Sequence, residues 1–269
     1  MLFLFLYLCI VKRKEIINHI STWLKDYSDK SKTNGFVIGI SGGIDSAVTS
    51  TLCALTGKKI FVLNLPIHQS QTEFDRSVLH IEWLQKNFKN VETKTVELSD
   101  IFKGFTEDLP SDIQDFLTMA NVRSRVRMIT LYAFASHHKL LVAGTGNKIE
   151  DFGIGFFTKY GDGGVDLSPI ADLTKTEVYD LAAELNIIES IQKARPTDGL
   201  YHDDRTDEDQ IGATYPELEW AMDYVENKKT DSLNDRQKVV LEIYNSRNRA
   251  NKHKMEAIPV CLIPKELKK

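Results

Sequence analysis

Hydrophobic positions along the chain follow two different spacings. Between Lys14 and Tyr27, apolar residues recur at positions 16, 17, 20, 23, 24 and 27, which is the spacing of an amphipathic helix. Residues 36–40 (FVIGI) and 59–66 (KIFVLNLP) are instead short apolar runs, as expected for strands buried on both faces. Residues 71–88 return to helical spacing, with apolar residues at 74, 78, 81 and 84. The first third of the chain therefore predicts strands that alternate with helices.

The same alternation continues to about residue 144. Helices are predicted over 44–55 and 112–136, and strands over 91–98 and 140–144. Such a pattern indicates a doubly wound parallel sheet. We expect an α/β fold with a Rossmann-like, five-stranded parallel sheet, helices on both faces, and a helical C-terminal extension after Ala171. Sheets of this kind bind ligands at the carboxyl ends of their strands.

The first eleven residues, MLFLFLYLCIV, are almost entirely apolar. The run is shorter than the roughly 20 residues that span a bilayer, and its basic residues follow it, whereas those of a signal peptide come first. Three interpretations are open: a membrane-leaning anchor, a strand or helix packed on the body or on a partner chain, and an upstream extension from a start codon assigned too early. We favour the last two and treat 12–269 as a single domain.

Composition and charge exclude several classes of protein. The net charge is −4, whereas a general nucleic-acid-binding protein would carry a basic excess. The three cysteines, Cys9, Cys53 and Cys261, form no CxxC pair, so neither a metal framework nor a disulfide framework is predicted. These features favour a cytoplasmic protein whose partners include neither nucleic acid nor a membrane.

The chemistry begins with GISGGIDSAV, residues 39–48, where a predicted buried strand turns into a helix. Unpaired N–H groups at a helix start bind anions, glycines let the backbone approach a phosphate, and Ser41 and Ser46 add hydroxyl groups. The P-loop pattern GxxxxGK[ST] is absent. Asp45 would repel a phosphate unless a divalent cation lay between them, so this acid predicts magnesium. The simpler alternative is a tight turn in which Asp45 and Ser46 cap the helix.

SGGIDS resembles the pyrophosphate-binding loop of the ATP pyrophosphatases. A second block, GTGNKIEDFGIGFFTKYGDGGVDLSPI at 144–170, is similar to the signature of the NAD synthetase family, and KTEVYDLAAEL, KARPTDGL, DEDQIGATYPELE and a late HK pair follow in the family's order. The resemblance runs from about Lys14 to Pro264. It favours the ammonia-dependent form, because 269 residues leave no room for the amidase domain of the glutamine-dependent form.

This resemblance implies a ligase of NAD biosynthesis. Members of the family amidate deamido-NAD with ammonia and ATP through an adenylated carboxylate, release NAD, AMP and pyrophosphate, and use Mg²⁺. The resemblance also implies a homodimer whose deamido-NAD site is shared between subunits. Two alternatives are another SGGxDS-type ATP pyrophosphatase, amidating or thiolating, and a non-catalytic nucleotide-binding module.

The resemblance assigns roles to individual positions. For ATP it implies contacts from Gly39, Ile40, Ser41, Gly42, Gly43, Ile44, Asp45, Ser46, Thr145, Lys175 and Thr197. For deamido-NAD it implies contacts from Arg125, Lys159, Asp166, His253 and Lys254. Asp45, Ser46 and Lys175 are expected to act in catalysis, and Asp162 is the candidate acceptor of the proton that ammonia gives up.

The second magnesium ligand, beside Asp45, has two candidates. Counting forward from Gly144 matches the family's acid to Glu150, whereas counting back from Gly155 matches it to Asp151, so one extra residue lies between the two glycines. We prefer Glu150 for the reach of its side chain. The alternative for either acid is a solvated loop residue.

Two further segments carry expectations. Helical spacing in NVRSRVRM places Arg123 and Arg127 on one face and Arg125 nearly opposite. The resemblance implies that Arg125 faces deamido-NAD, and Arg123 and Arg127 on the other face are expected to form surface salt bridges. The composition of GLYHDDRTDED, residues 199–209, is typical of disorder, and we interpret this stretch as a lid that orders with ATP.

Overall fold

The computed structural model describes residues 2–197 and 206–268, with side chains from Lys12 onward. Its sheet has four parallel strands in this part of the chain, in the order β3-β2-β1-β4. They are β1 (Gly35–Gly39), β2 (Lys59–Asn64), β3 (Val91–Thr95) and β4 (Leu141–Val142). The predicted α/β fold with a parallel sheet is confirmed.

The prediction of five strands is wrong by one. After β4, Ala143 forms a single parallel bridge with Leu167, supported by a hydrogen bond from Gly144 N to Leu167 O at 2.8 Å. Pro169 follows two residues later and has no N–H to donate. The pairing therefore stops at one bridge and does not become a strand.

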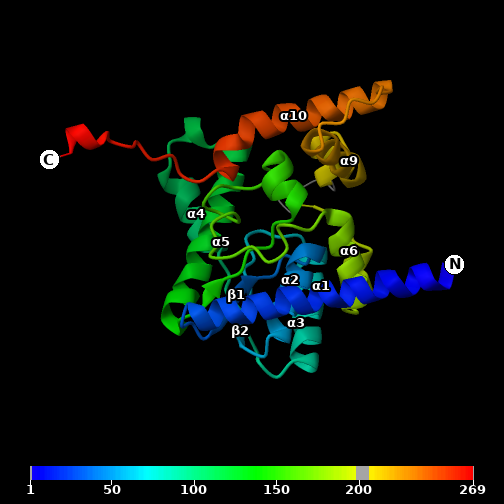
Figure 1. Cartoon of the computed structure of the whole chain (residues 1–269). Helices are drawn as coiled ribbons and strands as arrows, with labels where there is room; N and C mark the ends of the chain where they lie inside the picture. Colours follow the sequence, from blue (N-terminus) through cyan, green and yellow to red (C-terminus); the bar gives the residue numbers. More distant parts are fainter. Residues whose placement is uncertain (1, 198–205, 269) are drawn as a thin grey trace.

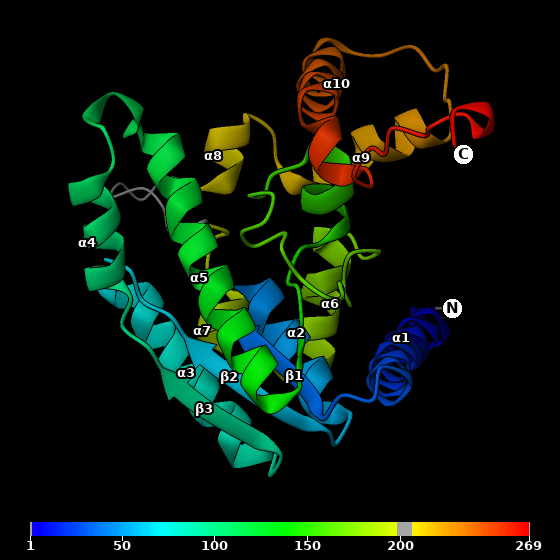
Figure 2. The ribbon, with the colours of Figure 1, turned by 90° about the vertical axis from the view of Figure 1, so that its left-hand side faces the viewer.

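Helices cover both faces of the sheet, as expected (Figure 2). One face packs against α1 (Leu2–Lys30), α2 (Ile44–Leu55), α3 (Gln71–Asn87) and α6 (Lys175–Glu184). The other face packs against α4 (Ser99–Asp108) and α5 (Phe116–His138). Apolar side chains of the strands thus enter a core on either side.

The apolar N-terminal run continues as one helix with the predicted helix over 14–27. In the second half of α1, Ile17, Ile20 and Leu24 are buried in the core, and Arg13 donates to Asp180 of α6 at 2.6 Å. Figure 1 shows α1 extending past α6 toward the N-terminus. Within the described residues, no helix is both long and apolar enough to cross a membrane.

The C-terminal extension is helical, as predicted. It contains α6, α7 (Glu189–Gln192), α8 (Asp207–Ile211), α9 (Tyr215–Glu226), α10 (Asp235–Met255) and η3 (Lys265–Leu267). In Figures 1 and 2, α9 and α10 lie side by side. Their apolar faces form a third cluster around the π-helical segment η2 (Ile149–Ile154).

Two predicted boundaries need correction. The helix expected from 112 is split into η1 (Ser111–Ile113) and α5, because the carboxylate of Asp115 caps α5 by accepting from Thr118 N at 3.0 Å. Of the stretch 199–209, residues 199–205 lie outside the described residues. Thr206 and Asp209 form a capping box that starts α8, so the disorder-like composition is misleading for residues 206–209.

Candidate active site

The loop between β1 and α2 has a backbone that requires glycine at one position. Gly42 has a φ of +83°, and a Cβ there would lie 2.7 Å from the carbonyl oxygen of Glu73 in α3. Gly43 then caps α2 in an extended conformation. The loop is thus held close to α3, and the first turn of α2 opens at the carboxyl end of β1.

Hydrogen bonds within the loop fix its two serines. Ser41 Oγ lies 3.1 Å from Ser46 Oγ and accepts from Gly43 N at 3.2 Å. Ser46 Oγ donates to Gly43 O at 3.0 Å. From outside the loop, Arg76 Nε donates to Gly42 O at 3.3 Å. The serine hydroxyls that the sequence predicts as phosphate donors therefore already face one another at the start of α2.

A cavity of about 540 Å³ opens over this loop. The predicted site residues that line it are Gly39, Ile40, Ser41, Gly43, Ile44, Asp45, Ser46, Thr145, Glu150, Asp151, Asp162, Lys175, Thr197 and Lys254. The predicted residues that do not line it are Gly42, Arg125, Lys159, Asp166 and His253. The structure thus gathers the predicted ATP residues except Gly42, together with Asp162, but only one of the five candidates for deamido-NAD, Lys254.

Lys175 is the centre of the charge arrangement in the cavity. Its ammonium donates to Asp45 Oδ2 at 2.6 Å and to Glu150 Oε1 at 3.0 Å, and the residue is only 3% exposed. Burial opposes the charged form, but the two carboxylates outweigh it and raise the pKa of Lys175. Burial also raises the pKa of Glu150, against the attraction of Lys175. One buried cation is therefore shared by two carboxylates.

Asn147 also forms hydrogen bonds to Asp45 and Glu150. Its amide nitrogen donates to Asp45 Oδ1 at 3.1 Å, and its amide oxygen accepts from the backbone of Ile149 and Glu150 at 3.1 and 3.2 Å. The side chain is fully buried. Sequence reasoning passed over Asn147, because an asparagine after glycine is also a common turn residue.

Tyr215 of α9 is the second residue that sequence reasoning missed. Its hydroxyl donates to Glu150 Oε1 at 2.6 Å and lies 3.3 Å from Asp207 Oδ2. The ammonium of Lys175 lies 4.7 Å from the centre of its ring. Burial and the neighbouring carboxylates raise the pKa of Tyr215, so its hydroxyl keeps its proton.

Asp151 occupies a different position from Glu150. A Cβ on Gly146 would lie 2.1 Å from Asp151 Oδ1, so this carboxylate rests against the glycine backbone. Burial, followed by the charges of Glu150, Asp162 and Asp45, raises the pKa of Asp151 to about 8. Both acids lie in η2, whose π turn is wider than an α-helical turn. Of the two acids, Glu150 is the one that shares Lys175 with Asp45.

The carboxylates of Asp162 and Asp166 both accept hydrogen bonds from backbone N–H groups. Asp162 Oδ1 accepts from Ser124 Oγ at 2.6 Å and from Thr158 N at 3.1 Å. Asp166 accepts from Tyr132 OH at 3.0 Å and from Val142 N at 2.8 Å, at the edge of the sheet. Asp162 also faces the cavity, whereas Asp166 does not.

The remaining candidates for the second substrate gather near the end of α10. Lys254 Nζ donates to Phe157 O at 2.6 Å. Lys159 Nζ donates to His253 O, and Arg125 Nη2 donates to Lys159 O at 3.3 Å. Arg125, Lys159 and His253 therefore form a linked group outside the cavity.

The arginines of α5 differ from expectation. Arg123 is only 7% exposed and lies over the ring of Phe102, at 5.6 Å from its centre, so the surface interpretation is wrong for it: its face of α5 packs on α4. Arg127 donates to Leu65 O at 3.0 Å and lines the cavity. Burial, then the charge of Arg123, lowers the pKa of Arg127 to about 10. The cation that α5 presents to the cavity is Arg127, not Arg125.

The side chains present fit a magnesium ion that is bound together with a nucleotide. In the described residues, no three His, Cys, Asp or Glu side chains are arranged to hold a metal by themselves. Mg²⁺ is usually bound by one or two carboxylates plus substrate phosphates. Asp45 and Glu150 supply two such carboxylates beside the anion-binding loop, and Lys175 shows that both already converge on one positive charge.

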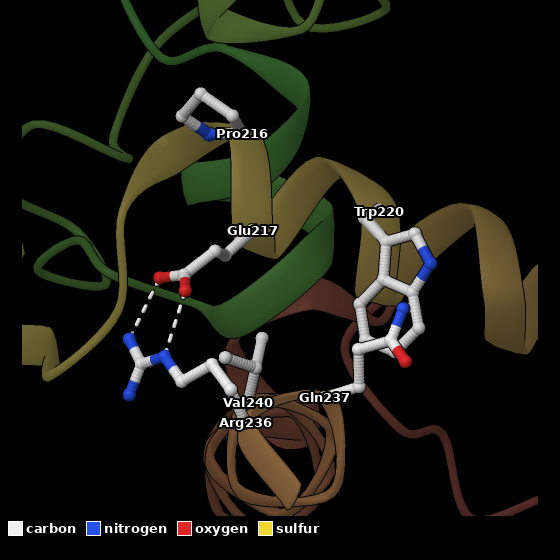
Figure 3. Close-up of a pocket in the computed structure, with 6 residues that line it drawn as sticks. All are labelled: Pro216, Glu217, Trp220, Arg236, Gln237 and Val240. Atoms are coloured by element: carbon white, nitrogen blue, oxygen red, sulfur yellow. Dashed lines mark hydrogen bonds and ion pairs between the residues drawn. The ribbon is translucent and has the colours of Figure 1, made fainter. Parts of the chain in front are cut away.

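A second, smaller hollow of about 240 Å³ lies between α9 and α10 (Figure 3). Its lining includes Trp220 and Gln237, together with the ion pair between Glu217 and Arg236 at 2.7 Å. None of its lining residues belongs to the predicted site. We therefore assign the chemistry to the larger cavity.

The fold and the site together define a nucleotide-binding protein of the Rossmann-like class. The features that carry this assignment are the parallel sheet, the glycine-rich loop at the start of α2 and the two carboxylates on a buried lysine. Residues 16–258 match the family model described as NAD synthase. This chain belongs to that family.

Named relatives agree with this assignment. The chain is 38% identical over 232 residues to an NH3-dependent NAD(+) synthetase of Mycoplasma genitalium, covering 84% of this chain and 88% of the relative. It is 35% identical over 252 residues to the enzyme of that name from Methanosarcina acetivorans, covering 90% and 96%.

Solved structures are similar over nearly the whole chain. The NMN synthetase of Francisella tularensis superposes with a TM-score of 0.81 at 31% identity, covering 94% of this chain and 98% of that one. The NH3-dependent NAD synthetase of Campylobacter jejuni gives a TM-score of 0.76 at 25% identity, covering 93% and 99%.

Proposed function

We propose that this protein is an ammonia-dependent ligase that amidates deamido-NAD to NAD while ATP is cleaved to AMP and pyrophosphate. The observation that carries the proposal is the convergence of Asp45, Glu150 and Lys175 beside the anion loop. The named relatives and the family model support the same reaction.

The chemistry explains why these residues are needed. A carboxylate is a poor electrophile, so its oxygen first attacks the α-phosphate of ATP and pyrophosphate leaves. Ammonia then attacks the acyl adenylate and AMP leaves. The first step gathers negative charge on the phosphates, which donors fixed in advance stabilise well. The loop N–H groups, Ser41, Ser46 and Lys175 are these donors in our proposal.

Magnesium is the proposed metal, held by Asp45 and Glu150. When bound, it would offset the charge of the phosphates and orient them. Lys175 donates to both carboxylates, and Asn147 donates to that of Asp45 and accepts from the backbone N–H of Glu150. Asp151 is not proposed as a ligand, because its carboxylate rests against Gly146 instead of meeting Asp45.

The ATP site is proposed at the loop. Residues 39–46 line or shape its floor, and Thr145 and Thr197 line the cavity around it. Thr197 Oγ1 donates to Glu73 Oε1 at 2.9 Å, which ties the chain before residue 198 to α3. These contacts support an adenine nucleotide with its phosphates over the start of α2.

The second substrate is proposed to lie between Asp162 and Lys254, with Arg127 as an added cation of the cavity wall. Asp162 remains the proposed proton acceptor for ammonia. Deamido-NAD would extend over Arg125, Lys159 and His253, outside the cavity of one chain. A ligand that runs beyond one chain suits a site shared in a homodimer, which we also propose. Asp166 stays a predicted contact, although it faces the sheet edge.

One observation favours a second candidate acceptor. The chain superposes well on an NMN synthetase, so nicotinate mononucleotide is the alternative substrate whose carboxylate would be amidated.

The non-catalytic alternative is less well supported, since Asp45, Glu150 and Lys175 are all present and in contact. A cytoplasmic location stays a prediction from cysteine usage.

The test is a product assay. Purified protein is incubated with ATP, Mg²⁺ and ammonium, with either deamido-NAD or nicotinate mononucleotide, and NAD, NMN and AMP are quantified. We expect NAD and AMP in equal amounts and a higher kcat/KM for deamido-NAD. A higher kcat/KM for the mononucleotide would reassign the acceptor, and the absence of any amide product from folded protein would refute the proposal.

A further inference from the structure

Tyr215 touches both charges of the proposed catalytic group. Its hydroxyl donates to Glu150 Oε1 at 2.6 Å, and its ring lies 4.7 Å from the ammonium of Lys175. The residue is 3% exposed and does not line the cavity, so it contacts Glu150 and Lys175 from the protein interior. Tyr215 is not among the site residues that the sequence predicts.

The two donors on Glu150 respond differently to a metal. Oε1 accepts from both Lys175 and Tyr215. A divalent cation between Asp45 and Glu150 would repel the ammonium that lies 2.6 Å and 3.0 Å from the same carboxylates. The hydroxyl of Tyr215 is neutral and is not repelled. Its hydrogen bond to Glu150 would therefore be kept if the bond from Lys175 weakened.

The position of Tyr215 is itself fixed by its neighbours. It is the first residue of α9, directly after Thr214, which forms a capping box with Glu217. Its own N–H donates to Glu208 Oε1 of α8 at 2.9 Å. A rigid helix start therefore supports the hydroxyl, as a second layer around a metal ligand requires.

We propose that Tyr215 is a positioning residue that holds the carboxylate of Glu150 toward the metal–ATP complex while Lys175 is released to the phosphates. The inference rests on the proposed function. It concerns how the metal ligand is oriented, and it assigns Tyr215 no contact with substrate.

The test compares Tyr215→Phe with wild type in the full chain. The substitution keeps the ring, its packing and its contact with Lys175, and removes only the hydroxyl. Mn²⁺ binding is measured by the electron paramagnetic resonance signal of free Mn²⁺, in the presence of α,β-methylene-ATP, which cannot be cleaved between these phosphates. We expect Mn²⁺ affinity to fall about 10-fold. In turnover, the Mg²⁺ concentration for half-maximal rate should rise by a similar factor, while KM for ammonium stays unchanged.

Tyr244→Phe is the matched control. Tyr244 is buried in the same apolar cluster and packs on Gly153 of η2, with its ring 3.4 Å from the position of a Cβ there. It should leave Mn²⁺ affinity unchanged. A normal Mn²⁺ affinity in Tyr215→Phe, or an equal loss in Tyr244→Phe, would overturn the inference. Wild-type NAD formation is measured in parallel: if wild type makes no amide product, the proposed function fails independently of this result.

Discussion

Lys175 is a buried cation that two carboxylates share, and we propose that it serves both stability and catalysis. Removing one partner of a buried ion pair leaves an uncompensated charge, at a cost of about 3 kcal/mol. In Lys175→Met, Asp45 and Glu150 would face each other without a cation. We expect the melting temperature to fall and NAD formation to drop about 100-fold or more. Added Mg²⁺ should stabilise this variant more than wild type, because the metal takes the place of the ammonium.

Lys14→Met serves as the control for that variant. Lys14 is an exposed lysine that pairs with Glu184 at 3.7 Å on the surface, and such pairs contribute little. Thermal unfolding with and without Mg²⁺ distinguishes the two variants. Equal melting temperatures of Lys175→Met and wild type would contradict the shared-cation arrangement.

The two neighbouring acids of η2 should differ in their dependence on metal. Glu150→Gln removes a proposed ligand and should raise the Mg²⁺ concentration for half-maximal rate at least about 10-fold. Asp151→Asn lies one residue away and should leave that concentration within about twofold, because Asp151 does not contact Lys175. Titration of the rate with Mg²⁺ measures both. The reverse order of effects would assign the ligand to Asp151.

At this scale the sequence predicts the residues of short motifs but not their partners. Asp45 and the loop serines follow from spacing within a few residues. The hydrogen bonds of Asn147, Tyr215 and Arg127 join residues that are 102, 65 and 62 positions apart in the sequence. No local pattern marks these residues. Arg125 was predicted from the resemblance. Helical spacing gives only the relative directions of the arginine side chains on α5, so it does not show that Arg127 meets the cavity.

At the scale of elements, α10 holds η2 and the loop after it in place. Asn248 donates to Gly153 O at 2.7 Å, and Asn251 donates to Ile154 O at 2.8 Å. These side chains satisfy carbonyls near the end of the π turn. We expect Asn251→Ala to destabilise the protein by about 1–3 kcal/mol, since a carbonyl of a buried residue loses its donor.

Denaturant unfolding measures this effect. Asn227→Ala is the control, because Asn227 is exposed and its side chain donates to the exposed carboxylate of Asp223. It should change stability by less than about 0.5 kcal/mol. Equal losses in the two variants would mean that α10 does not support η2.

The packing of α2 against α3 should be sensitive to acid. His80 of α3 is fully buried, with Nε2 3.0 Å from Ser50 Oγ of α2. Burial lowers the pKa of His80 from 6.5 to about 4. Between these values the unfolded chain takes up a proton that the folded protein does not, so stability falls as the pH falls from about 6.5 to 4. The loss at the lower end is about 3 kcal/mol.

Urea unfolding as a function of pH tests this prediction. His80→Gln should flatten the dependence between pH 6.5 and 4, whereas His19→Gln should not, because His19 is exposed on α1. An unchanged dependence in His80→Gln would assign the acid sensitivity to other groups.

Element types were predictable where periodicity is strong. The buried runs at 36–40 and 59–66 become β1 and β2, and 71–88 becomes α3. The predicted fifth strand does not form, because the pairing at Leu167 ends before Pro169. Whether such a short segment pairs with the sheet depends on tertiary contacts that the local sequence does not show. The sequence predicted one extra residue near Glu150, and it did not predict that residues 149–154 form a π turn.

At the scale of the whole molecule, the fold brings together three distant parts of the chain. Asp45 follows β1, Glu150 lies in η2 and Lys175 starts α6, yet all three meet beside one loop. The resemblance predicted a site role for each of the three residues. It did not predict that the ammonium of Lys175 would hydrogen-bond to both carboxylates.

A homodimer is the expected state of the molecule in solution. Arg125, Lys159 and His253 lie outside the cavity of one chain, which suits a ligand that also meets a second copy. Light scattering after size exclusion should give twice the chain mass of 30.6 kDa. A monomer with full activity would contradict the shared site.

The most direct test of the central claim follows oxygen atoms. Deamido-NAD labelled with ¹⁸O in its nicotinate carboxylate is converted with ATP, Mg²⁺ and ammonium, and the products are analysed by mass spectrometry. If the carboxylate attacks the α-phosphate at this site, one ¹⁸O atom passes to AMP for each NAD formed. Label in pyrophosphate or in inorganic phosphate, with unlabelled AMP, would contradict the account.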